Sequence, residues 1–317
     1  MERARTIFFG SGAFAVPILE AVLAAPELAL VAVVTAPPRP AGRRARPQPT
    51  PVASRAAGLS VPVLTPDRLR DPALLSSLAG LAPDVGVLAD YGKLLPGSVL
   101  DLPPHGILNL HPSLLPRHRG ATPIPAAILA GDRETGVSLF RMDPGMDTGP
   151  LVAVEVAALD PREDAPAAEE RLAALAAGLL LRSIGPYLRG ELAAQAQPEE
   201  GVTVTRPLVR EDGRLDPHRP ASELERRVRA LRPWPGTFVE IDDDRLAVLR
   251  AGIGEGSAGD EPGMIVADGP GVALATPAGR LRLLEVRPAG GRPMDGAAYR
   301  RGRPAVVGAR VVQARVG

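Results

Sequence analysis

The most constraining feature of this sequence is a regular alternation of short apolar runs and helical patterns along its first half. Three apolar runs have the length of buried strands, namely Thr6–Phe9, Leu30–Thr35 and Val85–Ala89. Helical patterns over Ala15–Ala24 and Asp67–Leu81 separate them. Strands that alternate with helices form a mostly parallel sheet with helices on both faces, because each helix crosses the sheet before the next strand begins. The first half therefore predicts an α/β, doubly wound fold.

The second half follows a different pattern, which predicts a second domain. Two more strand-like runs, Gly106–His111 and Val137–Met142, and an Ala/Leu-rich amphipathic helix over Asp164–Arg189 complete the first part. A polar stretch follows, and after it come one helix and a series of short runs between tight turns: Ala221–Leu231, then Gly236–Ile241, Leu246–Ala251, Gly263–Ala267, Val272–Ala275 and Leu281–Val286. Short strands with such turns are typical of small β-barrels. At 317 residues the chain suits two domains, and we expect a catalytic domain over residues 1–190, a linker over 191–205 and a β-barrel over 206–317.

Composition limits the chemistry and the partners of the chain. The absence of cysteine excludes disulfides, thiolate metal sites and cysteine nucleophiles. A net charge of +1 means that any contact with nucleic acid must come from local clusters. One such cluster lies in a Pro-rich stretch without acidic residues and consists of Arg39, Arg43, Arg44 and Arg46. It is either a binding surface or a solvated face in a chain whose only lysine is Lys93.

The sequence also predicts a cytoplasmic protein that is not embedded in a membrane. No apolar run approaches the length of a membrane helix. The segment before the first strand is shorter than a signal peptide.

The first strand leads into a glycine turn that partly matches a dinucleotide-binding fingerprint. Gly10-Ser11-Gly12 stands between a strand and a helix, as that fingerprint requires. The second strand, however, ends in Thr35-Ala36-Pro37 and offers no acidic residue for a ribose hydroxyl. A tight turn without a bound dinucleotide is therefore favoured.

The most informative stretch is Asn109-Leu110-His111-Pro112, at the end of the fourth predicted strand. Residues two apart in a strand project to the same face, so Asn109 and His111 point the same way. Pro112 ends the strand, which places His111 at the carboxyl edge of the sheet, where open α/β sheets bind ligands. Asp147 is the natural carboxylate partner, because Gly145 and Gly149 permit a close loop around it, whereas Asp143 fits a turn residue.

Three different chemistries compete with this reading of the site. Ser113, His111 and Asp147 could form a hydrolase triad, but Ser113 lacks the Gly-x-Ser-x-Gly turn and lies only two positions from the base. His105, His111 and His118 could bind a metal, but their spacing fits no helical ligand pair. Covalent catalysis by Lys93 is supported only by its place in a loop.

The same residues resemble the 10-formyltetrahydrofolate-dependent transferases. The resemblance is carried by Asn109-Leu-His111, the Ser113–Pro116 loop, Arg119-Gly120-Ala-x-Pro123 and Met142-Asp-x-Gly-Met-Asp147-Thr-Gly149. Further segments are similar to the methionyl-tRNA formyltransferases within that superfamily: Thr35–Arg44, Tyr91-Gly92-x-Leu-Leu-Pro96, Arg229–Pro235 and Leu284–Gly290. The sequence departs from that pattern in three places. Asp90 stands where a small apolar residue is usual. The aromatic residues expected near Val202–Pro207 and Gly213–Pro217 are missing, and so is the Thr-Gly expected within Asp164–Ala168.

This resemblance implies a fold, a reaction and a set of site residues. The fold is a Rossmann-like domain followed by an OB-like, tRNA-binding β-barrel. The reaction is transfer of the formyl group of 10-formyltetrahydrofolate to the amino group of methionyl initiator tRNA, without a metal. The implied catalytic residues are Asn109, His111 and Asp147. The implied folate contacts are Ser113, Leu114, Leu115, Pro116, Tyr91 and Gly92, and the implied tRNA contacts are Arg39, Arg43, Arg44 and Arg46.

Direct attack by an amine builds an oxyanion, so we expect Asn109 and His111 to stabilise that charge while Asp147 tunes His111. Two rival functions remain. One is formyl transfer to a sugar nucleotide or to glycinamide ribonucleotide, which would use the same three residues. The other is a tRNA- or folate-binding module without turnover.

Overall fold

The computed structural model describes residues 2–41, 46–242 and 244–312. It divides into two compact units. The first unit comprises Met1–Pro123, Arg133–Leu159 and Ala168–Arg206. The second comprises Ile124–Asp132, Asp160–Ala167 and Pro207–Gly317.

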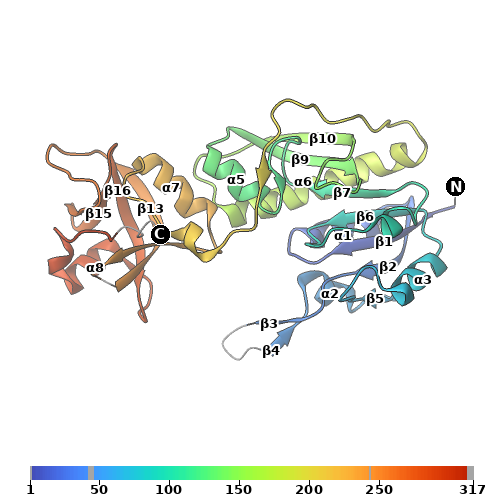
Figure 1. The fold of residues 1–317 in the computed structure, drawn as a ribbon, viewed down its shortest axis with the longest axis horizontal. Helices are drawn as coiled ribbons and strands as arrows, with labels where there is room; N and C mark the ends of the chain where they lie inside the picture. Colours follow the sequence, from blue (N-terminus) through green and yellow to red (C-terminus); the bar gives the residue numbers. More distant parts are fainter. Residues whose placement is uncertain (1, 42–45, 243, 313–317) are drawn as a thin grey trace. The chain divides into compact units, whose positions relative to one another are not determined.

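A seven-stranded sheet forms the centre of the first unit, with the order β10-β9-β7-β6-β1-β2-β5 (Figure 1). Its strands are β1 (Ala4–Gly10), β2 (Leu28–Val34), β5 (Val63–Leu64), β6 (Val85–Ala89), β7 (Ile107–His111), β9 (Glu134–Arg141) and β10 (Leu151–Ala158). The pairs from β5 through β7 are parallel, whereas β9 is antiparallel to β7 and β10 is antiparallel to β9. The prediction of a mostly parallel sheet is confirmed.

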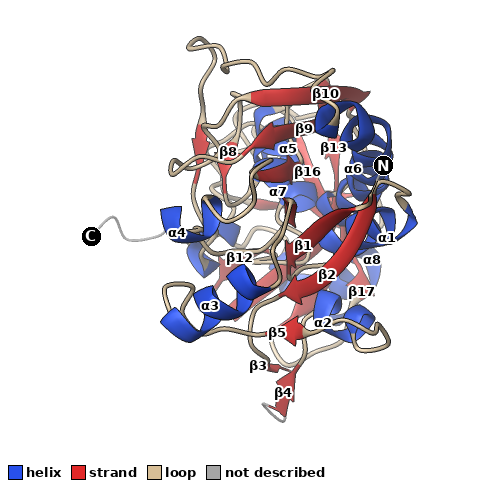
Figure 2. Ribbon diagram, turned by 90° about the vertical axis from the view of Figure 1, so that its right-hand side faces the viewer, coloured by secondary structure: helices blue, strands red, loops and turns tan. Residues whose placement is uncertain are grey.

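Helices cover both faces of this sheet. Helix α1 (Ala15–Ala24) contacts β1, β2 and β6, and α3 (Pro72–Gly80) and α4 (Gly97–Leu100) pack with Ile7 and Phe9 of β1 on the other face. Figure 2 shows α1 and α3 on opposite sides of β1 and β2. The other helices that begin or end in this unit are α2 (Pro51–Ala56) and α6 (Ala165–Leu188).

Helix α3 is shorter than the predicted segment Asp67–Leu81, because Asp71 caps it. The Oδ1 atom of Asp71 accepts a hydrogen bond of 2.9 Å from the amide of Ala73, and Pro72 occupies the first turn. Such a cap fixes the first residue of a helix whatever the pattern before it.

A short hairpin extends from the main sheet of the first unit (Figure 1). It consists of β3 (Arg39–Ala41) and β4 (Arg46–Gln48). At its base the hydroxyls of Thr35 and Thr50 are 2.6 Å apart, and Thr50 also caps α2. This contact ties together the two ends of the segment that carries the basic cluster.

The second unit contains an antiparallel sheet with the order β12-β13-β16-β15-β14, and β17 pairs with β16. Leu224 and Val228 of α7 pack against it in one apolar cluster. Within the described residues the edge strands β12 and β14 do not pair with each other, so the predicted closed, OB-like barrel is not confirmed. The elements of this unit are α5 (Pro123–Ala130), β12 (Thr237–Ile241), β13 (Asp244–Gly254), β14 (Ile265–Asp268), β15 (Gly271–Ala275), β16 (Arg280–Pro288), β17 (Met294–Asp295), α7 (Ala221–Ala230) and α8 (Gly296–Gly302), with 3₁₀ turns at Arg210–Gly213 and Pro304–Val306.

No helix in the described part of the chain is both long enough and apolar enough to cross a membrane.

Candidate active site

Strand β7 brings Asn109 and His111 to the carboxyl edge of the sheet. The strand ends at His111, as the following proline requires, and both side chains are buried. Asn109 pairs with Leu88 of β6 and Phe140 of β9, and His111 pairs with Ser138 of β9. Within the described residues the side-chain amide of Asn109 has no hydrogen-bond partner in the protein, so its N–H groups are available to a ligand.

The two ring nitrogens of His111 have different surroundings. Nε2 lies 2.9 Å from the carbonyl oxygen of His118. Because a carbonyl oxygen only accepts, Nε2 must carry a proton and donate it. Nδ1 lies 3.7 Å from Oδ2 of Asp147, which is too far for a direct hydrogen bond. The neutral ring therefore presents an unprotonated Nδ1 on the side of Asp147.

Asp147 lies in the loop between β9 and β10, in the left-handed backbone region with φ of +55°. Its Oδ2 accepts a hydrogen bond of 2.7 Å from the amide of Gly120. Asp143, in the same loop, accepts from the amide of Gly145 and the hydroxyl of Thr148. Asp143 is therefore a turn residue, as predicted, while the Asp147 carboxylate faces the imidazole.

Burial and charge act in opposite directions on His111. Burial is the larger effect and lowers the pKa of His111, whereas the Asp147 carboxylate and the hydrogen bond to the His118 carbonyl raise the pKa. The net direction is downward, so the imidazole is neutral near pH 7. A neutral ring with a free Nδ1 next to a carboxylate can accept a proton from a reacting amine.

The Ser113–Pro116 loop follows β7 directly and is fixed by hydrogen bonds to Arg117 and to Ser138 of β9. The hydroxyl of Ser113 is fully buried and donates to the carbonyl of Arg117 at 2.7 Å. The amide of Leu115 donates to the hydroxyl of Ser138 at 3.0 Å. Leu115 and Pro116 are buried and Leu114 is partly exposed. Because the Ser113 hydroxyl is committed to a backbone carbonyl, a hydrolase triad would lack its nucleophile.

Of the two predicted folate contacts Tyr91 and Gly92, the side chain of Tyr91 is buried, whereas the backbone at Gly92 is open. The ring of Tyr91 is buried in the core and makes an edge contact with Phe9, with ring centroids 5.8 Å apart. Burial raises the pKa of Tyr91 to about 12, and its hydroxyl is buried without a hydrogen-bond partner within the described residues. Gly92 has φ of +74°, and no atom of the described residues stands within 4 Å of the position that a Cβ would take. A ligand at this edge would meet the backbone near Gly92 rather than the phenol.

The structure describes only part of the basic cluster. Arg39 and Arg46 are exposed on β3 and β4. Arg43 and Arg44 lie outside the described residues.

Metal binding and covalent catalysis by Lys93 gain no support from the geometry. In the described ranges no group of three histidine or acidic side chains is placed to hold a metal. The ammonium group of Lys93 donates to the carbonyls of Pro66 and Asp67.

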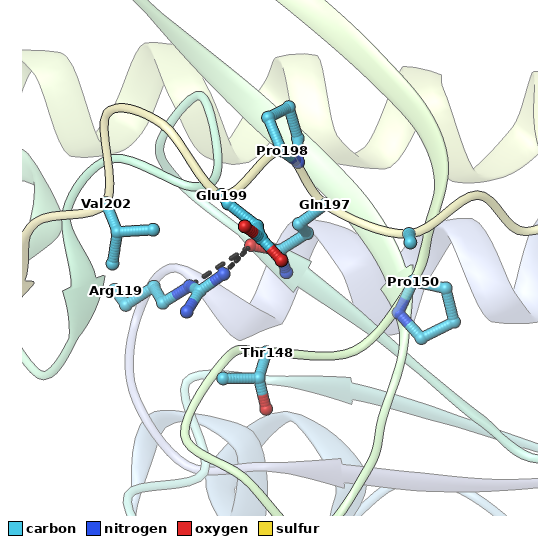
Figure 3. Close-up of a pocket in the computed structure, with 8 residues that line it drawn as sticks. Arg119, Thr148, Pro150, Gln197, Pro198, Glu199 and Val202 are labelled. Carbon is cyan, nitrogen blue, oxygen red and sulfur yellow. Dashed lines mark hydrogen bonds between the residues drawn. The ribbon is translucent and has the colours of Figure 1, made fainter.

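A pocket of about 560 Å³ opens beside the Asp147 loop, and none of the residues that line it was a site residue predicted from the sequence (Figure 3). Arg119, Thr148, Gln197, Glu199 and Val202 are among the residues that line it. Arg119 donates through Nε and Nη2 to Oε1 of Gln197, at 3.1 and 2.6 Å. Sequence reasoning noted Arg119 only as part of a motif. It had no signal for Gln197, which stands in a polar stretch without periodicity.

Comparison with known proteins decides the family. Residues 4–184 match the formyl transferase family, and residues 207–304 match the C-terminal domain of formyl transferases. The chain belongs to the formyl transferase family. Among the curated relatives of this formyl transferase, the methionyl-tRNA formyltransferase of Thermus thermophilus is 46% identical over 98% of this chain and 99% of its own length. The methionyl-tRNA formyltransferase of Chloroflexus aurantiacus is 43% identical over 93% of this chain and 96% of its own.

Solved structures share the fold of this formyl transferase at low sequence identity. An N-formyltransferase from Helicobacter canadensis, in complex with folinic acid and dTDP-3-aminofucose, has a TM-score of 0.67 and 14% identity, and the match covers 88% of this chain and 98% of that protein. HypX from Aquifex aeolicus, in complex with tetrahydrofolic acid, has a TM-score of 0.60 and 16% identity. That match covers 94% of this chain and 47% of HypX, so the chain spans about half the length of HypX.

Proposed function

We propose that the chain transfers the formyl group of 10-formyltetrahydrofolate to the α-amino group of methionyl initiator tRNA, giving formylmethionyl-tRNA for translation initiation. The observation that carries this proposal is a neutral imidazole with an unprotonated nitrogen beside a carboxylate, together with a side-chain amide, that of Asn109, which has no partner among the described residues. It occurs in a chain that is 46% identical over 98% of its length to a methionyl-tRNA formyltransferase.

His111 acts first as the base in the proposed mechanism. The α-amine has an unperturbed pKa of about 7.7–8.0, so a usable fraction is neutral near pH 7. As the amine attacks the formyl carbon and the new C–N bond forms, Nδ1 of His111 accepts the amine proton. The imidazolium is then stabilised by the Asp147 carboxylate, whose Oδ2 is 3.7 Å away.

Asn109 acts on the charge that develops on the formyl oxygen. Its side-chain N–H groups are the donors left without a protein partner among the described residues. Loss of one donor of this kind typically costs about 2.7–4 kcal/mol of barrier. When the carbon–nitrogen bond to the donor breaks, the proton held on Nδ1 of His111 passes to the departing nitrogen. One carbon–nitrogen bond has then formed and one has broken, one proton has moved from the amine to the departing nitrogen, and the imidazole is neutral again.

The donor and acceptor sites follow from the placement of the other residues. The Ser113–Pro116 loop and the backbone at Gly92 would hold the folate, since both adjoin the carboxyl edge of the sheet. Arg39, Arg43, Arg44 and Arg46 would pair with tRNA phosphates. Residues 206–317, taken as a domain of the oligonucleotide-binding type after a linker over 191–205, would add further backbone contacts.

One experiment tests this function directly. The purified chain is mixed with 10-formyltetrahydrofolate and methionyl initiator tRNA, and formylmethionine is measured after release from the tRNA. We expect formyl transfer by the native chain and a loss on the order of 10²–10⁴ in turnover for His111→Ala, with tRNA binding unchanged. A dTDP-linked amino sugar serves as the competing acceptor. Transfer to that sugar without transfer to the tRNA would refute the proposed acceptor.

A further inference from the structure

Residues 195–205, called the strap below, are attached to both loops that support the candidate active site. At one end the backbone of Gln195 forms a bridge with Leu151 through two hydrogen bonds of 2.7 Å. At the other end β11 (Val204–Thr205) pairs in parallel with β8 (Arg119–Gly120). The strap therefore runs beside the loop that supplies the His118 carbonyl and beside the loop that carries Asp147.

Gln197, inside the strap, joins these two loops through its side-chain amide. Its Nε2 donates to the carbonyl oxygens of Asp147 and Gly149, each at 2.8 Å. Its Oε1 accepts from Nε and Nη2 of Arg119 (Figure 3). Both ends of the amide are thus used, and each is bound to a different loop.

Asp147 needs such support, because its backbone has an uncommon conformation and its carboxylate must face the His111 ring. A left-handed φ of +55° is uncommon outside glycine, and although Asp adopts it more readily than most residues, the surroundings must hold it. The carboxylate accepts from Gly120, the neighbour of Arg119, and it stands 3.7 Å from Nδ1 of His111. The hydrogen bonds of Gln197 fix the backbone of Asp147 relative to the segment that contains both Arg119 and Gly120.

We infer that Gln197 is a positioning residue, which holds the Asp147 carboxylate opposite His111 through its hydrogen bonds to the Asp147 loop and to Arg119. The inference rests on the proposed function and adds Gln197 to the residues that support its active site. A displacement of about 1 Å in such a group can cost on the order of 100-fold in rate.

The matched pair Gln197→Glu and Gln195→Glu tests this role. Both add the same charge to the strap. Gln197→Glu keeps the acceptor for Arg119 but replaces the donor that holds the carbonyls of Asp147 and Gly149 by a repelling oxygen. Gln195 is exposed, and its side chain makes no hydrogen bond within the described residues. We expect kcat to fall roughly 10- to 100-fold for Gln197→Glu, with the KM for both substrates within about twofold of the native values. We expect Gln195→Glu to match the native chain.

The pH profile separates positioning from a structural role. Among the described residues, the ionisable groups that act on the His111 ring are the Asp147 carboxylate, which raises the pKa of His111, and the His118 ring, which lowers it. If Asp147 moves away in Gln197→Glu, the pKa of His111 falls further, and the acid limb of kcat shifts to lower pH. A loss of stability alone would leave that limb in place. A reduced kcat with an unshifted acid limb would therefore overturn the inference, as would a native kcat.

Arg119→Lys provides a second arm if Gln197→Glu does not fold. It removes the two donors of Arg119 to Oε1 of Gln197 and leaves the hydrogen bonds from Nε2 of Gln197 in place, so we expect a smaller fall in kcat and a smaller shift of the acid limb, again to lower pH. An unchanged profile in this variant would overturn the inference. The native chain run in parallel separates the two claims, because its failure to formylate methionyl-tRNA would refute the proposed function itself.

Discussion

Replacement of Gly120 by alanine should destabilise the first unit and disturb the site at once. Gly120 has φ of +100°, a region that side chains avoid, and a Cβ built there would stand 2.4 Å from the carbonyl oxygen of Thr205 in the strap. The strained backbone costs about 1–3 kcal/mol. The contact with Thr205 has the character of overpacking, which costs a further ~1–3 kcal/mol. We therefore expect Gly120→Ala to lower the free energy of unfolding by roughly 2–6 kcal/mol.

Two other glycines separate these two costs. Gly201 has φ of +78°, but in the part of the chain that the structure describes no atom lies within 4 Å of a Cβ placed there, so Gly201→Ala carries the backbone cost alone. Gly80, which ends α3, does not have a positive φ, and none of the described atoms lies within 4 Å of a Cβ placed there, so Gly80→Ala should be neutral or slightly stabilising. The expected order of stability is Gly80→Ala, then Gly201→Ala, then Gly120→Ala.

Urea unfolding measures this order, and turnover measures its effect on the site. With a typical m value of about 1–3 kcal/mol/M, the midpoint for Gly120→Ala should fall by roughly 1 M or more in the transition of the first unit. Because the Gly120 amide donates to Asp147, kcat should fall as well, even under conditions in which the variant is fully folded. A midpoint for Gly120→Ala equal to that for Gly201→Ala would refute the assigned contact with the strap.

Three further substitutions test the electrostatics of the chain. Asp147→Asn keeps an oxygen that can accept from the Gly120 amide and a residue type that tolerates a positive φ, so little stability should be lost. Because the negative charge beside His111 is removed, kcat should fall on the order of 10²–10⁴ and the acid limb of kcat should move to lower pH. An unshifted limb would contradict the pairing with His111. Burial, with a smaller contribution from the charge of Glu169, raises the pKa of Asp90 to about 6. The unfolding free energy of the native chain should therefore fall relative to that of Asp90→Asn as the pH rises from 4 to 7. The fall should be on the order of 1 kcal/mol, because Asp90 is exposed and solvent screens its charge, and parallel curves would show that the shift is absent. Arg46→Ala should raise the KM for methionyl-tRNA and reduce the slope of log KM against log salt by about 1, without a change in the KM for the folate; an unchanged slope would exclude a phosphate contact.

Local patterns predicted most of the first unit. The bounds of α1 and β6 agree with the predicted segments, because apolar periodicity and flanking turns determine them within one stretch of chain. The pairing of strands that are distant in the sequence was harder to predict. β10 is an edge strand that exposes Val154 and Val156, and only its register with β9 makes it a strand. The closure of a barrel likewise depends on which edges meet, which the lengths and spacing of strands do not determine.

The residues of the candidate site also divide into those that local sequence patterns predicted and those that depend on long-range contacts. The spacing of Asn109 and His111 and the proline after them identified the strand end, and two glycines marked the loop of Asp147. The support for that loop could not be predicted, because Gln197 reaches Asp147 across 50 residues with a single amide. The hydrogen bond from His111 to the carbonyl of His118 has no sequence signal either, since a residue of any type at position 118 offers the same carbonyl oxygen.

In the proposed mechanism, the hydrogen bond to the His118 carbonyl determines the order of the proton transfers. With the Nε2 proton committed to a backbone carbonyl, only Nδ1 can exchange a proton with a substrate, and burial keeps Nδ1 unprotonated before the amine arrives. His111 could donate to the oxyanion at the start only as an imidazolium, which burial disfavours. The amine must therefore give up its proton first, and Asp147 contributes most after that transfer, when the imidazolium would otherwise be a buried, uncompensated charge. It follows that both the amine and His111 must be unprotonated at the outset. Turnover should therefore decline at acid pH through two titrations, one of the amine and one of His111, and removal of the Asp147 carboxylate should shift only the titration of His111.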